Sequence, residues 1–452
     1  MKFFRDILLL LSVTSLLGGA GCAGFIYDNY PAGDDPEDQD MVTLVLNVGM
    51  VSPTRAGTDD REKMRDLRIV LLDNDGKVEY NRHIVFNTAL TEYKEGTQGY
   101  QFIRTKPGSK KIFFVANEMG VDPVQLTDRY GGTDRETLSG QSLTAVLDSR
   151  PAVSPDATGP VPTDFEALVK SVYFAPGDYS GMNIPLSSSY KFVIPDEKAG
   201  ERVVKEFYLV HAATKFEFLF VNNRLAPIQI NNLSVSSIAD KMYLMAHFEG
   251  EKGESVEPED KEMTWTDEEK TGNWIDWLKA VSDATTDETN VKDPNNESIN
   301  KRYGWIKDYV LPASQHEEKF VVADKPVPSD ELITIPTTAT TANPYKGVPV
   351  TYFPESKYIP TGSGDNQQYR FSVTLTDTDG LLSGENKQRT FDLSLTDISA
   401  NGITYDNLEA LFRNTHVRVT CIIGYDQKDI SLELLIGICP WNTEEINIPA
   451  FD

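Results

Sequence analysis

The residues that could perform catalysis or bind a metal are scattered through this chain of 452 residues. No two histidines stand at the spacing of a metal-binding pair, and there is neither a G-x-S-x-G motif nor a phosphate-binding glycine loop. Carboxylates are so numerous that no glycosidase-like pair stands out. The histidines are His83, His211, His247, His316 and His416. We therefore predict a protein that is not an enzyme and that needs no metal or cofactor.

Proteolytic cleavage of the chain itself has a candidate site at Arg55. Arg55 follows Pro53 in a polar run, where the backbone should be exposed and extended enough to enter a protease. Cutting between Arg55 and Ala56 would free everything before it as a separate piece. Arg61 and Arg65 are competing sites, and an ordinary loop arginine is the alternative interpretation.

The piece that such a cut would free contains a predicted strand over residues 42–50. Apolar residues fall on alternate positions there, which is the period of a half-buried strand. Pro53 ends the pattern, because proline cannot continue a hydrogen-bonded ladder. The alternating residues are Val42, Leu44, Leu46, Val48 and Met50. A plain first strand followed by an uncut loop would give the same pattern.

Residues 1–22 have the organisation of a secretory leader, with basic residues, a short apolar core and small residues before Cys22. The apolar core is too short to span a membrane. The last positions resemble the lipobox of a bacterial lipoprotein, in which Cys22 is lipidated and becomes the mature N-terminus. Gly19 departs from the usual leucine of that motif. Ordinary signal-peptidase cleavage at Ala20 or Gly21 is the alternative.

The composition argues against two classes of partner, nucleic acids and anionic membrane surfaces. The formal net charge is −26, whereas nucleic acids and anionic membrane surfaces both require a basic face. Hydrophobic residues make up 40% of the chain, which is ample for packed cores.

We expect an all-β chain with two β-sandwich domains and a few short helices. An acidic, flexible tether over 23–40 leads into a first domain over 41–209. The second domain covers 210–452 and contains an insertion at about 245–310. A short helix is predicted over 164–172.

The predicted strands share alternating or continuous apolar residues bounded by turn residues. They span 67–72, 77–80, 83–86, 100–103, 111–116, 190–193, 206–209, 215–221, 320–322, 331–335, 348–353, 369–376, 389–395, 417–424 and 430–438. The first two should be joined by a hairpin turn at Asp73–Gly76; a calcium loop there would lack the required ligand spacing. Strands 100–103 and 111–116 should pair with each other around Pro107.

Cys421 and Cys439 fall in the final hairpin, where Cys421 should face roughly residue 433. At about 3.3 Å per residue the two lie roughly 20 Å apart, too far for a disulfide. We interpret both as small buried hydrophobic residues.

Trp274 and Trp277 share one face of a predicted short helix over 273–281. They should dock that helix on the sandwich, and stacking on a sugar ring is the alternative. At the C-terminus, Ile446, Ile448 and Ala450 alternate, so the tail can form one more strand.

Four segments of the chain together resemble the fimbrillins, the subunits of type V pili. They are the lipobox with its tether, the strand that ends in Pro53-Thr54-Arg55-Ala56, and two later groups. One group combines residues 183–187 (NIPLS) with 208–215 (YLVHAATK). The other combines 351–355 (TYFPE) with 412–419 (FRNTHVRV) and the final Pro440-Trp441. His211 stands where the family pattern more often has arginine.

The resemblance implies two transthyretin-like β-sandwich domains and export to the outer membrane and cell surface as a lipoprotein. It implies that an arginine-specific protease removes the first strand, and that other fimbrial subunits are the partners. The emptied groove would accept a strand from a neighbouring subunit, for which Ile446, Ile448 and Ala450 are the candidate donor residues. An anchor or tip subunit of the same family, or a surface glycan-binding lipoprotein, are the alternatives.

Overall fold

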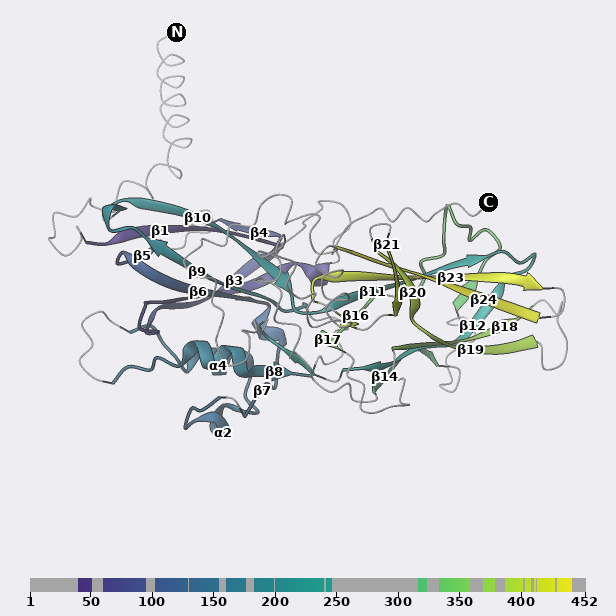
Figure 1. Ribbon diagram of the computed structural model, residues 1–452, viewed down its shortest axis with the longest axis horizontal. Coiled ribbons are helices and arrows are strands. Elements are labelled where there is room, and N and C mark those ends of the chain that lie inside the picture. Colours follow the sequence, from purple (N-terminus) through teal and green to yellow (C-terminus); the bar gives the residue numbers. More distant parts are fainter. Residues whose placement is uncertain are drawn as a thin grey trace, which may run out of the picture.

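The computed structural model describes residues 40–50, 60–94, 102–153, 160–175, 183–245, 316–322, 333–357, 369–378 and 387–440, apart from isolated positions within these ranges. It is built mainly of strands, arranged as two lobes side by side along the long axis (Figure 1). The all-β expectation is confirmed. No helix among the described residues is long and apolar enough to cross a membrane.

The first lobe contains an eight-stranded sheet in the order β3-β2-β6-β9-β10-β1-β4, with β5 also paired to β1. The strands β9 and β10 share only two residue pairs, so the sheet opens there and its two halves face each other across one core. The strands are β1 (Val42–Met50), β2 (Met64–Leu72), β3 (Val78–Leu90), β4 (Glu92–Lys94), β5 (Ile103–Thr105), β6 (Gly108–Ala116), β9 (Leu186–Ile194) and β10 (Arg202–His211).

A small helical layer covers the other face of β2 and β6 (Figure 1). Val70 and Phe113 point into this layer, whereas Ile69 and Phe114 point toward β1. Both faces of β2 are therefore buried, which explains its nearly continuous apolar run. The layer contains α2 (Arg135–Leu138), α3 (Leu143–Asp148), α4 (Phe165–Ser171), β7 (Gln125–Leu126), β8 (Val172–Phe174) and β13 (Met242–Tyr243). The helix expected over 164–172 is confirmed as α4.

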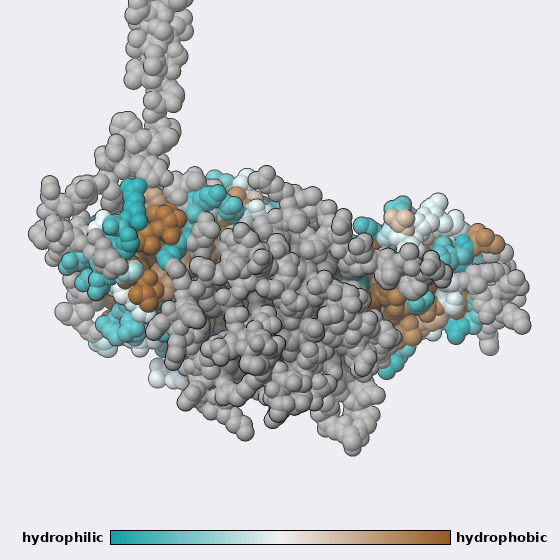
Figure 2. Space-filling view, turned by 45° about the horizontal axis from the view of Figure 1, so that its top comes forward, coloured by the Kyte–Doolittle hydropathy of each residue, from teal (hydrophilic) through white to brown (hydrophobic). Residues whose placement is uncertain are grey.

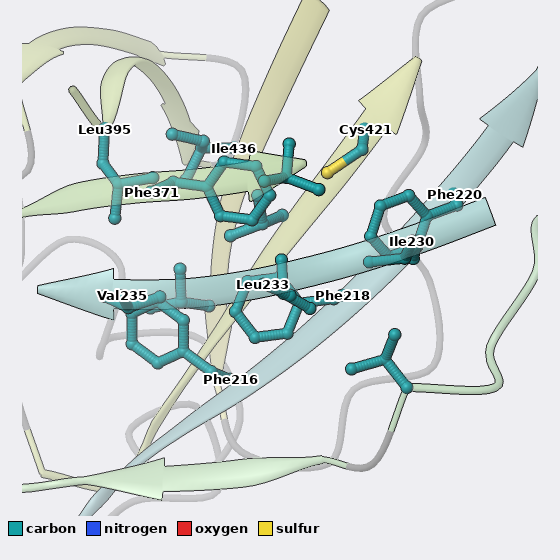
Figure 3. Packing of buried hydrophobic residues seen from close by; sticks show 14 of the residues in the cluster. Phe216, Phe218, Phe220, Ile230, Leu233, Val235, Phe371, Leu395, Cys421 and Ile436 are labelled. Atoms are coloured by element: carbon teal, nitrogen blue, oxygen red, sulfur yellow. The ribbon is translucent and has the colours of Figure 1, made fainter. Parts of the chain in front are cut away.

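The second lobe packs a six-stranded sheet, β16-β11-β23-β24-β20-β21, against a five-stranded sheet that contains β14, β12, β18, β19 and β15. Figure 3 shows their apolar side chains pointing toward one another. The strands are β11 (Thr214–Asn222), β12 (Ile228–Ile238), β14 (His316–Val322), β15 (Ile333–Ile335), β16 (Thr351–Phe353), β18 (Arg370–Asp377), β19 (Gln388–Ser394), β20 (Thr396–Ala400), β21 (Ile403–Asn407), β23 (Thr415–Asp426) and β24 (Asp429–Pro440). A short ladder joins β17 (Ser356–Lys357) to β22 (Ala410–Leu411). Three 3₁₀ turns complete the described structure: η2 (Asp60–Glu62), η3 (Glu118–Gly120) and η4 (Asp196–Lys198).

Aromatic rings join the two sheets of the second lobe. Phe218 on β11 stacks on Phe371 of β18, with ring centroids 5.8 Å apart. Cys421 lies in the same core, fully buried and with a free thiol (Figure 3). Its expected role as a small buried hydrophobic residue is confirmed. It faces Leu434, and Cys439 faces His416 further along the same hairpin.

Two expectations about the strands of the first lobe require correction, one on strand boundaries and one on strand pairing. The expected strands 77–80 and 83–86 form one continuous strand, β3. The expected pair of 100–103 with 111–116 is wrong, because β5 pairs with β1 while β6 pairs with β2 and β9. Gly108, at a φ of 120°, turns the chain after β5 so that β6 joins the other half of the sandwich.

The turn expected at Asp73–Gly76 is present. The Asp73 carboxylate accepts hydrogen bonds from the backbone N–H groups of Asp75 and Lys77, each at 2.9 Å. Gly76 takes a φ of 80°, which suits glycine. The domain boundary expected at 209/210 stays a prediction; β10 of the first sheet ends at His211, and β11 of the next begins at Thr214.

Candidate functional site

The candidate site is the place in the first lobe that β1 occupies. The strand runs parallel to β10 over eight residue pairs, from Thr43 with Arg202 to Met50 with Leu209. On its other side it pairs with β5 and then with β4, both antiparallel. Because β1 is an interior strand, its removal would expose two unpaired strand edges.

The side chains of β1 alternate strictly between the core and the outer face, as the sequence predicts. The five inward residues Val42, Leu44, Leu46, Val48 and Met50 are all 0% exposed.

Aromatic rings lie in the same core as these five side chains. Phe207 of β10 is their centre, with its ring centroid 4.9 Å from that of Tyr190 and 5.0 Å from that of Phe114. Phe192 lies 5.8 Å from the same ring. Removing β1 would therefore leave a long apolar groove.

The outer face beside β1 is also partly apolar. Figure 2 shows hydrophobic surface flanked by hydrophilic surface on the first lobe. Val204 of β10 is 59% exposed, and its partner on β1 is Val45.

The chain that follows β1 is held firmly from Asp60 onward. The Asn117 side chain accepts from the Arg65 N–H at 2.8 Å and donates to the Lys63 carbonyl at 3.0 Å. The backbone N–H of Ile184 donates to the Arg61 carbonyl at 2.9 Å. The covalent link between β1 and this fixed segment is residues 51–59, which contain Arg55.

Glu62 fastens the same segment to the second lobe. Its Oε1 lies 2.7 Å from the Lys215 ammonium and accepts a hydrogen bond from the Tyr352 hydroxyl at 2.9 Å. Its backbone oxygen lies 2.9 Å from His211 Nε2. Glu62 and His211 are both 0% exposed.

The later segments that carry the family resemblance meet at this same seam between the lobes. Arg413 forms an ion pair with Glu355 at 2.8 Å and reaches Ser187 Oγ at 3.3 Å. Asn414 Oδ1 accepts from the His211 backbone N–H at 3.1 Å. The residues NIPLS, YLVHAATK, TYFPE and FRNTHVRV are thus distant in sequence and adjacent in space.

A second buried ion cluster supports the start of β2. Arg68, 1% exposed, makes two 2.7 Å contacts with the carboxylate of Glu118. His83 lies between two carboxylates, 3.3 Å from Asp66 Oδ1 and 3.3 Å from Glu118 Oε1. Burial lowers the pKa of His83, but the neighbouring Asp66 and Glu118 outweigh this, and the pKa lies above its ordinary value.

Every residue that the sequence nominates for a modification or strand donation lies outside the described residues. They are Cys22, Arg55, Ala56, Ile446, Ile448 and Ala450, and the tryptophans Trp274 and Trp277 lie outside them as well. Within the described part of the chain, no group of three or more His, Cys, Asp or Glu side chains is arranged to hold a metal.

Sequence reasoning missed two residues of the site, Glu62 and Lys205. Lys205 belongs to the inward row of β10, where it interrupts the apolar residues Val203, Phe207 and Leu209. That interruption is the signal that could have identified it. Glu62 gives no such signal, because a lone glutamate after a polar loop is expected to be exposed.

Comparison with known proteins finds no matching family model and no matching curated protein. Among solved structures, the chain is similar to the tip fimbrial protein Mfa3 of Porphyromonas gingivalis, with a TM-score of 0.44 and 11% identity over 89% of this chain and 100% of that one.

It is also similar to the fimbrilin fimA of Porphyromonas gingivalis W83, with a TM-score of 0.41 and 9% identity over 88% of this chain and 98% of that one. A third similar structure is that of a cell adhesion protein from Parabacteroides distasonis. Its TM-score is 0.40 and its sequence identity is 9%, over 89% of this chain and 98% of that one. The structural neighbours of this all-β chain are fimbrial and cell adhesion proteins.

Proposed function

We propose that the chain is a structural subunit of a cell-surface fimbrium, polymerised by strand donation after removal of its first strand. The observation that carries the proposal is the way in which β1 is held. This strand is buried along one whole face and is paired with other strands on both sides. A cut within residues 51–59, which contain Arg55, would separate it from the chain that follows. The sequence motifs that resemble fimbrillins support the same assignment.

The two pieces that a cut would produce are each held independently. β1 is held by its neighbours β10, β4 and β5. The chain from Asp60 onward is held by Asn117 and by the contacts of Glu62. Cleavage after Arg55 would therefore leave the lobe folded and convert β1 into a non-covalent ligand that another strand can displace.

The energetics explain why the groove would not stay empty. Five buried apolar side chains at roughly 1.5–3 kcal/mol each give roughly 7–15 kcal/mol of gross stabilisation. Loss of β1 would also leave the ladder groups of β10 and β5 unpaired. An extended strand from another subunit can satisfy both requirements by strand addition.

The incoming strand must run parallel to β10, as β1 does, and present apolar residues at alternate positions. The tail of a second copy offers Ile446, Ile448 and Ala450 in that pattern. Pro449 lies on the other face of such a strand and removes one ladder donor.

Lipidation at Cys22 belongs to the same proposal. A lipid at the mature N-terminus would hold the precursor at the outer membrane through the acidic tether. Cys22 lies on the β1 side of the cut, so displacement of β1 after cleavage at Arg55 would open the groove and release the subunit from its anchor in one step. The Cys22→Ala variant should stay unprocessed or misdirected, and normal maturation with membrane fractionation of that variant would contradict lipidation.

The test is controlled proteolysis of the purified precursor. A trypsin-like protease should produce a chain that begins at Ala56, followed by oligomers. Arg55→Ala should block both steps while circular dichroism stays that of a folded β protein. Arg55→Lys is the matched control: trypsin should still cut it and start assembly, whereas an arginine-specific protease should not.

Two results would overturn the proposal. The first is a native surface form that begins at Cys22 with β1 intact, which would indicate an anchor subunit. The second is cleavage after Arg55 without any oligomer at high protein concentration. Deletion of residues 442–452 tests the donor strand, because it removes Ile446, Ile448 and Ala450. The truncated protein should be a folded monomer that is still cleaved after Arg55 but cannot extend a polymer.

A further inference from the structure

The β10 side of the β1 groove contains a cation, Lys205. The inward side chains of β10 are Val203, Lys205, Phe207 and Leu209, and each faces an inward residue of β1 across the parallel ladder. Lys205 is the Cα partner of Leu46. Its ammonium lies 5.8 Å from the centroid of the Phe192 ring, which is buried in the core under β1.

The groove wall disfavours a positive charge while β1 is in place. Burial lowers the pKa of Lys205 below its ordinary value. The β1 residues nearest to it on the inward face are Leu44, Leu46 and Val48, and all three are apolar. A strand that carried a carboxylate at this depth would add a charge-assisted contact that these β1 side chains cannot make.

We propose that Lys205 selects the incoming strand by pairing with a carboxylate on it, and that Glu444 of a second copy provides that carboxylate. This inference rests on the proposed function, because it names the partner of the same groove. It makes Lys205 a specificity-determining residue for strand exchange.

The sequence of the tail allows a register that fills the apolar pockets and brings a carboxylate near Lys205. Placing Ile446, Ile448 and Ala450 where Leu46, Val48 and Met50 now lie fills the pockets beside Lys205, Phe207 and Leu209. Glu444 then takes the place of Leu44, opposite Val203 and two residue pairs along the ladder from Lys205. Long side chains reach such diagonal neighbours in a sheet.

The ion pair between Lys205 and Glu444 would also favour the tail over β1 as the occupant of the groove. The β1 strand presents only apolar side chains to this part of the groove, whereas the tail presents Ile446, Ile448 and Ala450 together with the carboxylate of Glu444. A charge-assisted contact in a partly buried groove favours the correct partner and accelerates encounter at low salt. Because each chain carries a net charge of −26, salt also screens the repulsion between two copies, so the contribution of the pair is measured as the ratio of the wild-type rate to that of a variant without the charge. That ratio should fall as salt is raised.

Charge reversal with rescue is the test. Each of Lys205→Glu and Glu444→Lys should slow oligomer formation by the Arg55-cleaved protein at least about tenfold, because like charges then meet in the groove. In the double variant the two charges are exchanged, and the rate should return to within about threefold of wild type. Lys77→Glu, at an exposed turn outside the groove, is the matched control and should assemble as wild type.

Lys205→Met keeps the aliphatic stem and removes the charge. It should still assemble, and the ratio of the wild-type rate to its own rate should fall as salt is raised, which a purely structural role of Lys205 would not predict. Circular dichroism and urea unfolding of each uncleaved precursor separate assembly defects from folding defects. Lys205→Glu assembling at the wild-type rate, or a double variant no faster than the single ones, would overturn the proposal.

The register can be tested without disturbing the charged pair. Val204→Cys on one subunit should form a disulfide with Glu445→Cys on another, because residue 445 would replace Val45 opposite Val204. Cross-linking through Thr443→Cys instead would move Glu444 directly opposite Lys205 and keep the pair. Cross-linking through neither position would overturn the pairing. Wild-type protein that does not assemble after cleavage, or that assembles without its tail, would instead refute the proposed function.

Discussion

The carboxylate of Glu62 and the ammonium of Lys215 lie 2.7 Å apart in the buried seam between the two lobes. Glu62 stands just after residues 51–59, and Lys215 stands at the start of β11. Cleavage after Arg55 would leave this contact on the mature chain. The new N-terminal segment would therefore stay attached to both lobes after β1 is gone.

The Glu62→Gln variant should be markedly less stable than wild type. The substituted amide would keep the shape but leave the Lys215 charge buried without its carboxylate, and breaking a buried pair in this way costs about 3–5 kcal/mol. The free energy of unfolding from urea titration is the measurement. Asp60→Asn is the control, because Asp60 pairs with Lys63 at the exposed surface, where loss of a pair costs about 0–1 kcal/mol. Equal effects of the two changes would contradict the buried role of Glu62.

Leu46→Ala should destabilise the uncleaved precursor by about 2–5 kcal/mol, because it leaves a cavity in the core of the first lobe. Val45→Ala is the matched control on the same strand. Val45 points to the outer face and is only half-buried, so its loss should cost under about 1 kcal/mol. Urea unfolding of both precursors measures the difference.

The same pair of variants also tests strand removal. In polymers assembled from the mature chain, which lacks β1, neither change should have any effect on stability. A difference that persists in the polymer would mean that β1 is still bound there.

The sequence allowed β1 to be predicted correctly because its alternation is unbroken over nine residues. The strand β12 gave no such signal. It contains a bulge between Ile230 and Asn232, which shifts the alternation by one position, so its inward residues Ile230 and Leu233 do not share one period. The pairing partners of the strands could not be predicted from the sequence either, since local patterns do not encode the parallel ladder of β1 with β10.

The candidate site was predictable only in part for the same reason. The strand and its cleavable loop are local features of the sequence. The seam is not, because Glu62 and Tyr352 meet across 290 positions. The significance of Lys205 likewise depends on the fact that the parallel ladder places it opposite Leu46.

His83 should make the stability of the protein depend on pH above about 6.5, the ordinary histidine pKa. Its pKa is raised in the folded state by Asp66 and Glu118, in spite of burial and of the opposing charge of Arg68. The folded state therefore binds the proton more tightly than the unfolded state. The resulting stabilisation is complete below the unfolded pKa and is lost as pH rises through the folded pKa.

The His83→Gln variant isolates this contribution. Its deficit in free energy of unfolding, relative to wild type, should be largest near pH 5.5 and should shrink by pH 8.5. An NMR titration of the His83 ring gives the folded pKa directly. A folded pKa at or below the ordinary value, or a deficit independent of pH, would show that the two carboxylates do not hold the imidazolium.

Limited proteolysis of the folded precursor should cut after Arg55 well before it cuts after Arg61 or Arg65. A protease must bind an extended stretch of chain, and cutting within a hydrogen-bonded segment requires local opening first. The Arg61 carbonyl accepts from Ile184, and its guanidinium lies 5.1 Å from the centroid of the Tyr352 ring. The N–H of Arg65 is bound by Asn117. Mass spectrometry of the fragments at successive times gives the order of cleavage.

The Asn117→Ala variant tests the cause of this protection. It removes the hydrogen bonds of the Asn117 side chain to Arg65, Lys63 and Ile184. Cleavage after Arg61 and Arg65 should accelerate by about tenfold or more, since the two hydrogen bonds that hold Arg65 and Lys63, at about 1 kcal/mol each, no longer oppose local opening. Cleavage after Arg55 should keep its wild-type rate. If Arg61 or Arg65 is cut first in the wild-type precursor, the hydrogen bonds that hold the chain from Asp60 onward do not determine the processing site. Arg55 would then not be that site.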